Sequence, residues 1–564
     1  MLKKIVVILS LTISLLCLAE PALNAATPEA NDNQLFRNEV VQYLRQVAAH
    51  AALGAVEPTG AALDARWSRA YQTIDWTVHI TAYRKGAEIG RGDAHGPGLA
   101  DALRSAVEIS LLDAAAAIAS NDDLEQLRFK VSFDYFPART FSIIEYQGQG
   151  LELLGNRVAV RRINADMIKQ QVNDSQRYLL DVMHPQLHGF YKIYNAGDNR
   201  HESHLRTIYS SSSLYSLLKL YQLNRDPELE KNFRPIADFI LARQIKAGEN
   251  AGGFYYSIDP KTQKPSCLIV VGTASKSIFT LLELDRFYKN APQYLQAARK
   301  AGDWLLTMVK ADGRVSPTAS CAQGAWRYEQ KQSMLYSGQV LAALSRLTAT
   351  TGDRRYLEGA GRIARRFIAE IERQGLLLGD DYRPPNSISS SWALMSLIDY
   401  AKINSGPEYR QLISRLGAML IARQINNPDD AFNAGRYQDT ISTSGNGWIN
   451  EVMGNLYGFC VNERMPDCGP YRQAMIASSR WLLQNAYTEA NSYETKNPAK
   501  AAGGFIRNFR LRYVRTDAVC HGVNSLISLL QITGPGESLS LELPEQPLAE
   551  ILHMLRAGNS ILAI

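Results

Sequence analysis

The stretch "ILARQIKAGENAGGF", residues 240–254, is echoed by "LIARQINNPDDAFNAGRY" at residues 420–437. Both copies contain Ala-Arg-Gln-Ile followed by a polar loop with glycine, and the second copy begins 180 positions after the first. A spacing of this size suggests three periods of about 60 residues rather than a single duplication. Intermediate copies of one structural unit should therefore lie between the two.

Amphipathic segments, with apolar residues at three- and four-residue spacing, recur along this part of the chain and predict helices. Segments richer in small and apolar residues alternate with them, and a helix with little polar surface is usually buried. Six amphipathic and six buried helices predict a mainly α fold, an (α/α)6 toroid of six helical hairpins; an open superhelix of hairpins is the alternative. The amphipathic segments are 167–183, 233–245, 294–309, 356–371, 409–425 and 471–486.

The connections between these helices are of two kinds. Each inner helix is followed by a tight turn rich in Pro, Gly and Asp, which suit turns and helix starts. Each outer helix is followed by a long loop, and such loops on a rigid scaffold often carry binding sites. These loops would share one face with the N-termini of the inner helices, whose unpaired N–H groups favour anionic ligands. Four of the loops are 246–270, 310–331, 426–442 and 487–514.

The first residues have the pattern of a secretory signal peptide. Two lysines precede an apolar run from Ile5 to Leu18, and small residues surround Ala25. We expect a cleaved signal peptide at 1–25 and a periplasmic or secreted protein; an uncleaved membrane anchor is the alternative. No later segment is long and apolar enough to cross a bilayer, so we expect no stable membrane insertion after cleavage.

A small α+β domain should precede the toroid. Residues 77–92 predict a hairpin, 98–118 a helix, and 128–136 a strand with alternating aromatic and apolar residues. This order of elements faintly resembles AMMECR1-type domains, which imply no particular activity. The predicted boundaries are 26–155 for this domain, 156–535 for the toroid and 536–564 for a tail with a terminal helix.

Five cysteines follow the predicted signal peptide. Cys460 and Cys468 flank a short connection, so a disulfide closing that loop is expected in an oxidising compartment. The other three, Cys267, Cys321 and Cys520, could remain free thiols. None of the five has the paired C-x-x-C spacing of a zinc site.

The sequence predicts neither a metal centre nor a cofactor. His201 and His204 lie close to Glu202, but this loop offers no convincing third ligand. The formal net charge of +6 is mild for 564 residues, and no basic run indicates nucleic acid as a partner.

The last long loop carries the densest set of candidate residues. Asp517 and His521 lie four positions apart at the start of the sixth inner helix, so they share a face directed at the interior of the ring. Arginines in such a place suit a substrate with carboxylates or sulfates. A solvated basic loop with a capping Asp and a packed His is the alternative. The cationic and aromatic candidates are Arg507, Arg510, Arg512, Tyr513 and Arg515.

Other loops combine aromatic side chains with carboxylates and amides. A sugar site needs this combination, because an aromatic face stacks on the apolar side of a pyranose while polar groups bind its hydroxyls. Each such residue taken singly also occurs in caps and at core edges. The candidates are Glu202 in the first loop, Trp326, Arg327, Glu329 and Tyr336 in the third, and Asp439, Asn446, Trp448 and Glu451 in the fifth.

Two mechanisms are compatible with these residues. Abstraction of the proton α to a uronate carboxylate needs Arg or Asn to neutralise the carboxylate, and a His or Tyr base with a second acid; it serves both epimerases and lyases. Hydrolysis of a neutral glycoside instead needs two carboxylic acids across the bond. The arginine-rich last loop favours uronates. The carboxylates available for hydrolysis are Glu329, Asp380, Asp439, Glu451 and Asp517.

Three segments resemble the helical C-terminal domain of D-glucuronyl C5-epimerases: "YSGQVLAALSRLTATTGDRRYLEGAGR" (336–362), "SISSSWALMSLIDYAK" (387–402) and "RTDAVCHGVNSLISLL" (515–530). The resemblance covers roughly 320–530 and implies a carbohydrate-active toroid with proton transfer by Tyr336, Glu329 and Tyr513. That family has a β-rich region before its helices, whereas a small α+β domain is expected here.

The sequence therefore predicts an exported enzyme that acts on an acidic polysaccharide or oligosaccharide by epimerisation or elimination. A glycoside hydrolase of the six-hairpin type is a second possibility. A non-catalytic polysaccharide-binding or export accessory protein is a third, because it would keep the aromatic and arginine residues without a correctly spaced acid and base.

Overall fold

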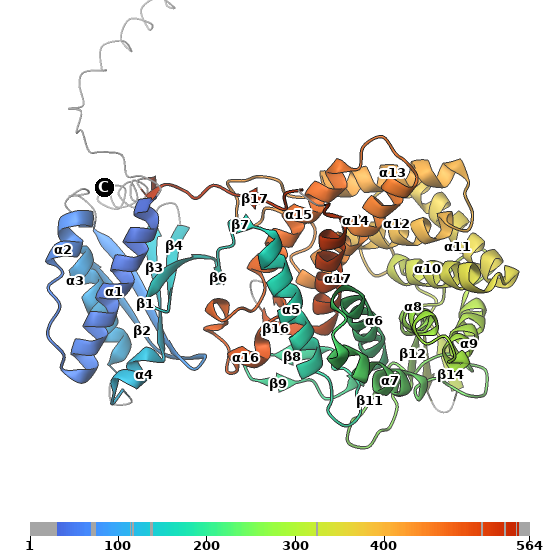
Figure 1. Cartoon of the computed structure of the whole chain (residues 1–564), viewed down its shortest axis with the longest axis horizontal. Coiled ribbons are helices and arrows are strands. Elements are labelled where there is room, and N and C mark those ends of the chain that lie inside the picture. Colours follow the sequence, from blue (N-terminus) through green and yellow to red (C-terminus); the bar gives the residue numbers. More distant parts are fainter. Residues whose placement is uncertain are drawn as a thin grey trace, which may run out of the picture.

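The computed structural model describes residues 31–68, 75–112, 114, 118–135, 139–322, 325–508, 511–534, 537–548 and 550–551. The predicted signal peptide at 1–25 lies outside these residues. The described chain forms a small α+β part and a large ring of helices, joined by two extended segments (Figure 1). Within the described ranges, none of the helices combines the length and the hydropathy needed to span a bilayer.

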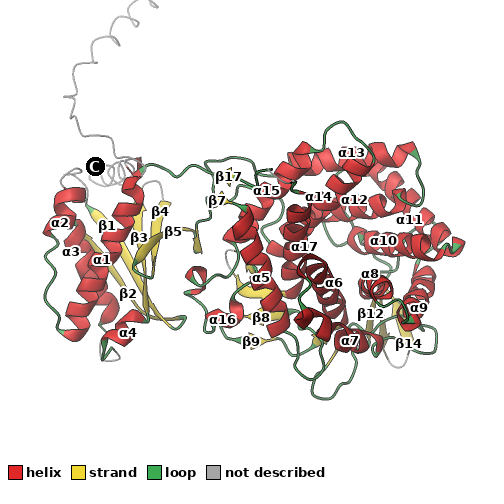
Figure 2. Cartoon of the chain, viewed as in Figure 1, coloured by secondary structure: helices red, strands yellow, loops and turns green. Residues whose placement is uncertain are grey.

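The α+β part is a six-stranded antiparallel sheet in the order β2-β1-β3-β4-β5-β6, with helices on one face (Figure 2). Alternation along β3 places Phe129, Val131 and Phe133 in the core with no exposed surface. The predicted hairpin, helix and strand correspond to β1–β2, α3 and β3. The elements are α1 (Asn31–Leu53), α2 (Ala61–Leu63), β1 (Trp76–Arg84), β2 (Ala87–Gly96), α3 (Leu99–Leu111), α4 (Asn121–Glu125), β3 (Leu127–Tyr135), β4 (Arg139–Tyr146), β5 (Gln149–Leu154) and β6 (Arg157–Val158).

Six outer helices surround the ring, and each buries one stripe of apolar residues. In α11 the buried positions recur every three or four residues, from Tyr356 through Ile363 and Phe367 to Ile371. Asp226 and Asp353, which lie in two of the tight turns, cap the N-termini of α7 and α11 with their side chains. The outer helices are α5 (Ala165–Asp181), α7 (Pro227–Leu241), α9 (Pro292–Met308), α11 (Arg354–Gln374), α13 (Pro407–Ala422) and α15 (Gly469–Gln484).

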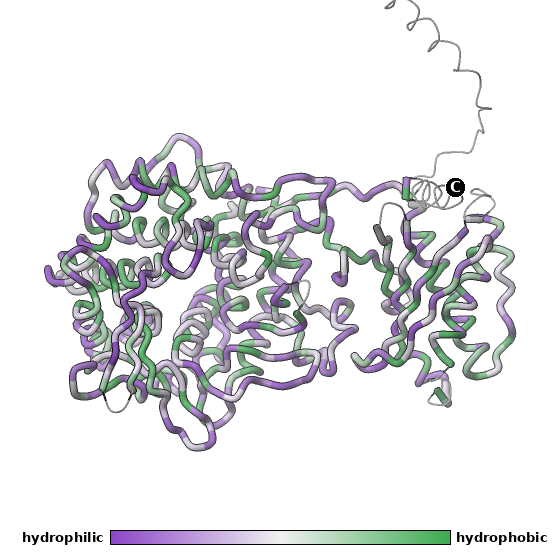
Figure 3. The backbone as a smooth tube through the Cα atoms, turned by 180° about the vertical axis from the view of Figure 1, so that it is seen from behind, coloured by the Kyte–Doolittle hydropathy of each residue, from purple (hydrophilic) through white to green (hydrophobic). Residues whose placement is uncertain are grey.

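Six inner helices close the ring. Each packs against the next along the chain, and the last, α17, packs back against the first, α6. This closure confirms the predicted (α/α)6 toroid of six helical hairpins and excludes the open superhelix. The inner helices are buried nearly all round, while hydrophilic residues gather in the outer connections (Figure 3). They are α6 (Thr207–Asn224), α8 (Val271–Phe287), α10 (Met334–Thr351), α12 (Ser387–Ala401), α14 (Thr443–Asn462) and α17 (Thr516–Ile532).

The repeated Ala-Arg-Gln-Ile follows outer helices α7 and α13 and makes the same contacts in both places. The Gln244 side-chain amide donates to the carbonyls of Gly252, 3.1 Å away, and Ala297, 2.9 Å away. Gln424 donates in the same way to Gly435, at 3.0 Å, and Ala474, at 2.8 Å. Each glutamine therefore ties its own loop to the next outer helix, which explains why the chain repeats the motif.

The long loops carry short strands that pair with strands of neighbouring loops. β16 of the last loop pairs with β8 of the first, β10 of the first with β11 of the second, and β12 of the second with β13 of the third. A short helix, α16 (Pro498–Ala501), also lies in the last loop. The strands are β8 (Ile193–Asn195), β9 (Arg200–His201), β10 (Leu205–Arg206), β11 (Ser257–Ile258), β12 (Leu268–Val270), β13 (Thr318–Ala322), β14 (Ala325–Tyr328), β15 (Ile506–Asn508) and β16 (Leu511–Arg515).

Two disulfides are present in the described chain. The bond between Cys460 and Cys468 confirms the prediction from their spacing. The expectation of free thiols is wrong for Cys267 and Cys321, which are bonded to each other, and holds for Cys520, which is free and buried. Pairing of β12 with β13 brings Cys267 and Cys321 to adjacent strands, with Cα atoms 5.4 Å apart, although 54 positions separate them.

The tail after the ring contacts both parts of the molecule. Its strand β17 (Leu541–Glu542) pairs with β7 (Arg162–Ile163) at the edge of the ring. Further on, Leu548 and Ile551 join the core beneath the N-terminal sheet. The described part of the tail therefore links the two parts a second time (Figure 1).

Candidate active site

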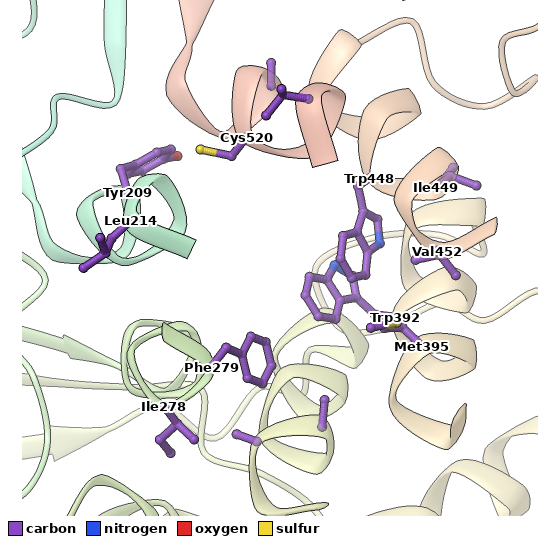
Figure 4. Close-up of a cluster of buried hydrophobic side chains, with 14 of the residues drawn as sticks. Tyr209, Leu214, Ile278, Phe279, Trp392, Met395, Trp448, Ile449, Val452 and Cys520 are labelled. Carbon is purple, nitrogen blue, oxygen red and sulfur yellow. The ribbon is translucent and has the colours of Figure 1, made fainter. Parts of the chain in front are cut away.

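A cavity of about 370 Å³ opens where the inner helices begin. Each of the six inner helices contributes at least one residue to its wall. The cavity lies at the N-terminal ends of these helices, where the predicted toroid places the long loops. Two smaller voids continue toward the ring interior, and Lys276 borders all three spaces. Figure 4 shows the aromatic side chains of Phe279, Trp392 and Trp448 around this interior.

A larger cavity, about 1240 Å³, lies between the N-terminal sheet and the ring. Its walls include surface turns and charged residues of both signs, such as Lys85, Arg177 and Asp174. The smaller cavity inside the ring is the better candidate site, because side chains from six separate helices converge there and several ionisable groups have strongly shifted pKa values.

The first functional group of the cavity is a histidine held by a buried carboxylate. Nδ1 of His521 lies 2.7 Å from Oε2 of Glu451, and Asn524 donates to the other carboxylate oxygen at 3.0 Å. Burial alone would raise the pKa of Glu451, but its hydrogen bond to His521 and the charges of His521 and two lysines lower it to about 2. Glu451 is therefore ionised and orients the imidazole. Since Nδ1 is engaged, Nε2 is the nitrogen that can serve the cavity.

The second group is an arginine–aspartate pair. Arg515 binds Asp517 through two hydrogen bonds, of 2.8 Å and 2.6 Å, and also donates to the hydroxyl of Tyr209 at 3.1 Å. Burial opposes the charge on Asp517, yet the charge and hydrogen bonds of Arg515 hold the pKa of this carboxyl below its usual range. With Arg383 and Arg507 also in the wall, cationic groups outnumber carboxylates around the cavity.

The third group is a lysine among aromatic rings. Nζ of Lys276 lies 5.0 Å and 5.2 Å from the ring centroids of Trp392 and Trp448, which stack on each other at 3.7 Å. Burial lowers the pKa of Lys276 to about 8, against the opposing charge of Glu451. A large fraction of this amine is therefore neutral near pH 8.

Phenol and amide groups complete the wall. Burial raises the pKa of Tyr336 above its ordinary value, so this phenol stays protonated at neutral pH and can donate a hydrogen bond. The side-chain oxygen of Gln339 is buried and has no hydrogen-bond partner among the described residues. It offers an acceptor to a hydroxyl of a bound molecule.

Six of the residues predicted from sequence line this cavity: Tyr336, Trp448, Arg507, Arg515, Asp517 and His521. Trp448 is only 4% exposed, and its indole N–H donates to Ser391 at 3.0 Å. Its ring lies at a steep angle to His521, with centroids 5.0 Å apart. Trp448 therefore supports His521 and closes the wall.

Two predicted residues of β16 lie outside the cavity. Arg512 points to the opposite side of the strand from Arg515, because side chains alternate along a strand. Tyr513 shares the face of Arg515 but lies further from the ring, where its backbone pairs with Asn195. Arg510 lies outside the described residues.

Three predicted residues of the third loop, Trp326, Arg327 and Glu329, lie outside the cavity. Trp326 and Arg327 pair with β13 and do not line the cavity. The Glu329 carboxylate accepts hydrogen bonds from the backbone N–H groups of Lys331, at 3.0 Å, and Gln330, at 2.8 Å. These bonds lower the pKa of Glu329, so it stabilises a turn and is poorly suited to proton transfer.

Three further predicted residues hold loops in place. Asp439 accepts from the backbone N–H of Ser387 at 2.6 Å and so caps α12. Asn446 has no exposed surface and bonds the backbone of its own loop. Glu202 forms an ion pair with Arg206 at 2.9 Å. Asp380, the remaining hydrolytic candidate, likewise accepts from the N–H of Met334 at 2.8 Å.

No metal cluster of three or more His, Cys, Asp or Glu side chains exists in the described ranges. In the loop with His201, the imidazole stacks on Tyr191 with ring centroids 4.7 Å apart. Burial lowers the pKa of His201 to about 4. This histidine is a packed, neutral residue.

Sequence reasoning did not identify several residues of the wall as candidates. A lone lysine in "GTASKSIFTLLELDRFY" and a lone tryptophan in "SSSWALMS" were the available signals, since both interrupt segments of small and apolar residues. Their roles become visible only when the inner helices face one another. The missed residues are Tyr209, Tyr256, Lys276, Gln339, Arg383 and Trp392.

Several solved structures match this chain over most of their own length. Cellobiose 2-epimerase from Bacillus thermoamylovorans B4167 matches 65% of this chain and 98% of its own, with a TM-score of 0.51 and 12% identity. An unsaturated glucuronyl hydrolase specific for heparin matches 65% and 98%, with a TM-score of 0.48 and 10% identity. A family 76 glycoside hydrolase from a bovine Bacteroides thetaiotaomicron strain matches 81% and 93%, with a TM-score of 0.48 and 12% identity.

The first of these likenesses shows the (α/α)6 fold, and at such low identity it shows the fold alone. No protein-family model matches the sequence, and no curated protein matches it. The chemistry of the cavity therefore has to be argued from its own residues.

Proposed function

We propose that this protein is a carbohydrate-active enzyme that removes the proton next to the carboxylate of a uronate residue, as epimerases and lyases do. The observation that carries the proposal is the His521–Glu451 pair, which faces a cavity bordered by Arg383, Arg507 and Arg515. The carbohydrate enzymes among the structures of similar fold support a sugar as the substrate.

The arrangement of charge suits this reaction. Removal of the proton leaves negative charge on the substrate carboxylate, and arginines placed beforehand stabilise that charge. His521 would accept the proton on Nε2 while Glu451 stabilises the resulting imidazolium. Tyr336, protonated at neutral pH, can donate a hydrogen bond to the same carboxylate or to a hydroxyl.

The carboxylates argue against hydrolysis by a pair of acids. Among the described residues that line the cavity, Asp517 is the only carboxylate, and Arg515 already binds both of its oxygens. A hydrolytic general acid needs a raised pKa, whereas the pKa values of Asp517 and Glu451 are both lowered.

Incubation with polyuronates in deuterated water tests the proposal. Polyglucuronate, polygalacturonate and polymannuronate are incubated with the protein, and C5 exchange is followed by NMR together with absorbance of unsaturated products. We expect exchange or elimination with at least one polymer, and a loss of about 10²–10⁴-fold in His521→Gln. His79→Gln, on the distant N-terminal sheet, is the matched control and should retain activity. If the wild-type protein leaves every polymer unchanged, the proposal is wrong.

The proposal includes export. Residues 1–25 support it through their lysines, apolar run and small residues. Expression of the full chain followed by N-terminal sequencing of the protein outside the cytoplasm tests this part. A mature N-terminus near Ala26 is expected, and retention of the intact chain in the cytoplasm would contradict it.

A further inference from the structure

Lys276 is the one lysine that borders the candidate cavity within the described residues. It projects from α8 across the ring axis, with its ammonium group against Trp392 of α12 and Trp448 of α14. Phe279, one turn further along α8, also contacts it, at 5.6 Å. Lys276 therefore lies at the junction of the cavity and the deeper voids, where a bound molecule can reach it.

Titratable groups of four helices lie around this lysine. Glu451 of α14 opposes the loss of its proton, while Arg346 of α10 favours it. Asp517, Cys520 and His521 of α17 and Tyr215 of α6 also lie near it. Because burial outweighs the attraction of Glu451, the neutral amine is accessible near pH 8.

Lys219 provides an internal comparison. Its Nζ lies 3.8 Å from Oε1 of Glu451 and 5.1 Å from the ring of Tyr215. Although burial lowers the pKa of Lys219, its electrostatic interactions with Tyr215 and Glu451 outweigh burial and raise the pKa. Lys276 has no ion-pair partner among the described residues. The two lysines thus share one buried carboxylate, but the pKa of Lys276 is lowered and that of Lys219 is raised.

We propose that Lys276 is the second proton-transfer group of this site, so that the sugar exchanges its proton with two side chains, His521 and Lys276. This inference rests on the proposed function. Both groups line the cavity and contact the ring of Trp448 between them, at 5.0 Å and 5.2 Å from its centroid, so a sugar in the cavity lies within reach of both.

The two groups together allow epimerisation. His521 Nε2 accepts the proton of the substrate carbon, and the electron pair of the broken C–H bond moves into the enediolate of the carboxylate. The ammonium of Lys276 then donates a proton to the same carbon, which forms the new C–H bond and leaves a neutral amine. His521 releases its proton to water and Lys276 takes one up. No oxidant or other reactant is needed.

The reactivity of Lys276 can be measured on the wild-type protein without any substrate. The intact protein is treated with methyl acetimidate between pH 7 and 10, and the modification of each lysine is followed by mass spectrometry. At pH 8 we expect a neutral fraction of Lys276 about 100-fold larger than that of an ordinary lysine. Lys219 is the matched control and should react slowly. Equal, slow reaction of both lysines would overturn the proposal.

The role in turnover is tested with Lys276→Met, which keeps the length of the side chain, and Lys276→Arg, which keeps the charge. The substrate is a polyuronate whose C5 proton the wild-type protein exchanges for deuterium. Both variants should still catalyse this exchange in one epimer, because His521 is intact. Interconversion of the epimers should fall about 10²–10⁴-fold.

The outcomes separate the two proposals. Absence of exchange by the wild-type protein on every polyuronate would overturn the proposed function and the catalytic role of Lys276 with it. Exchange by the wild-type protein with undiminished interconversion in both Lys276 variants would overturn the role of Lys276 alone.

Discussion

Two histidines of this chain are paired with carboxylates in opposite surroundings. His79 lies on the open face of the N-terminal sheet, 2.7 Å from Asp93 and 2.8 Å from Asp134, and 38% of its side chain is exposed. His521 lies inside the ring, 2.7 Å from Glu451, with 11% of its side chain exposed. The distances are alike. The difference is the surrounding medium, because water screens the pair on the sheet and the ring interior does not.

A His–carboxylate pair interacts strongly enough to support catalysis only where burial limits the screening of its charges by water. A buried pair costs much to break because the remaining partner is left charged without compensation. An exposed pair exchanges its partner for water at little cost. Four experiments test this contrast between the buried and the exposed pair.

The largest effect is expected from Glu451→Ala. Removal of this carboxylate leaves His521 without its hydrogen-bond partner and Lys219 and Lys276 without their shared counter-charge, and we expect a loss of about 3–5 kcal/mol in the free energy of unfolding. Urea unfolding followed by circular dichroism measures it. Glu228→Ala, at the exposed start of α7, is the control and should change little. An unchanged urea midpoint for Glu451→Ala would contradict the argument.

Acid should affect the buried pair next most strongly. The pKa of Glu451 is lowered from 4.5 to about 2. Its contribution to the free energy of unfolding is therefore complete above about pH 4.5 and is lost as the pH falls toward 2. The shift corresponds to roughly 3 kcal/mol. Unfolding of the wild-type protein and of Glu451→Gln is compared from pH 2 to 6. The difference between them should vanish at the acid end, and a constant difference would contradict the assignment.

Arg515→Lys should have an intermediate effect. Lysine keeps the charge but cannot bind both oxygens of Asp517, and we expect a loss of about 1.5–3 kcal/mol. Thermal unfolding measures it. Arg91→Lys, at the exposed pair with Glu88, is the matched control on the N-terminal sheet and should shift the midpoint much less. Equal shifts for both variants would remove the contrast between the two parts.

The smallest effect is expected from His79→Asn, under about 1 kcal/mol, because the pair is exposed. Burial would lower the pKa of His79, but hydrogen bonds to Asp93 and Asp134 raise it. The contribution of His79 to the free energy of unfolding is therefore complete below pH 6.5 and is lost as the pH rises through its raised pKa. This pH dependence is opposite to that of Glu451, whose contribution is lost as the pH falls. Unfolding midpoints at pH 5 and pH 9 test this. A larger loss at pH 9 than at pH 5 would refute it.

The fold was largely predictable because its signals are local. The apolar spacing in 356–371 identified α11, and the echo of Gln244 in Gln424 marked equivalent positions of one repeat. The disulfide of Cys460 and Cys468 also follows from short spacing. The bond between Cys267 and Cys321 escaped, because two paired strands from different loops create it.

The candidate site was predictable only in part. Asp517 and His521 lie on one helix, so their common direction follows from helical spacing. Glu329, Asp380 and Asp439 carry suitable chemistry but bind backbone N–H groups at turns and helix starts. Residue type does not distinguish a carboxylate that caps a helix from one that faces a substrate.

The amino-acid sequence alone predicted the repeat, the two classes of helix and the end of the inner helices where a site can form. These properties depend on spacing along one helix or loop. The tertiary structure decided that α17 packs against α6 and closes the ring. It also decided that His521 and Lys276 meet at one cavity, that Glu451 of a third helix holds His521, and that these surroundings shift the pKa values of Glu451 and Lys276. Burial and convergence arise from the packing of separate helices, which no local pattern records.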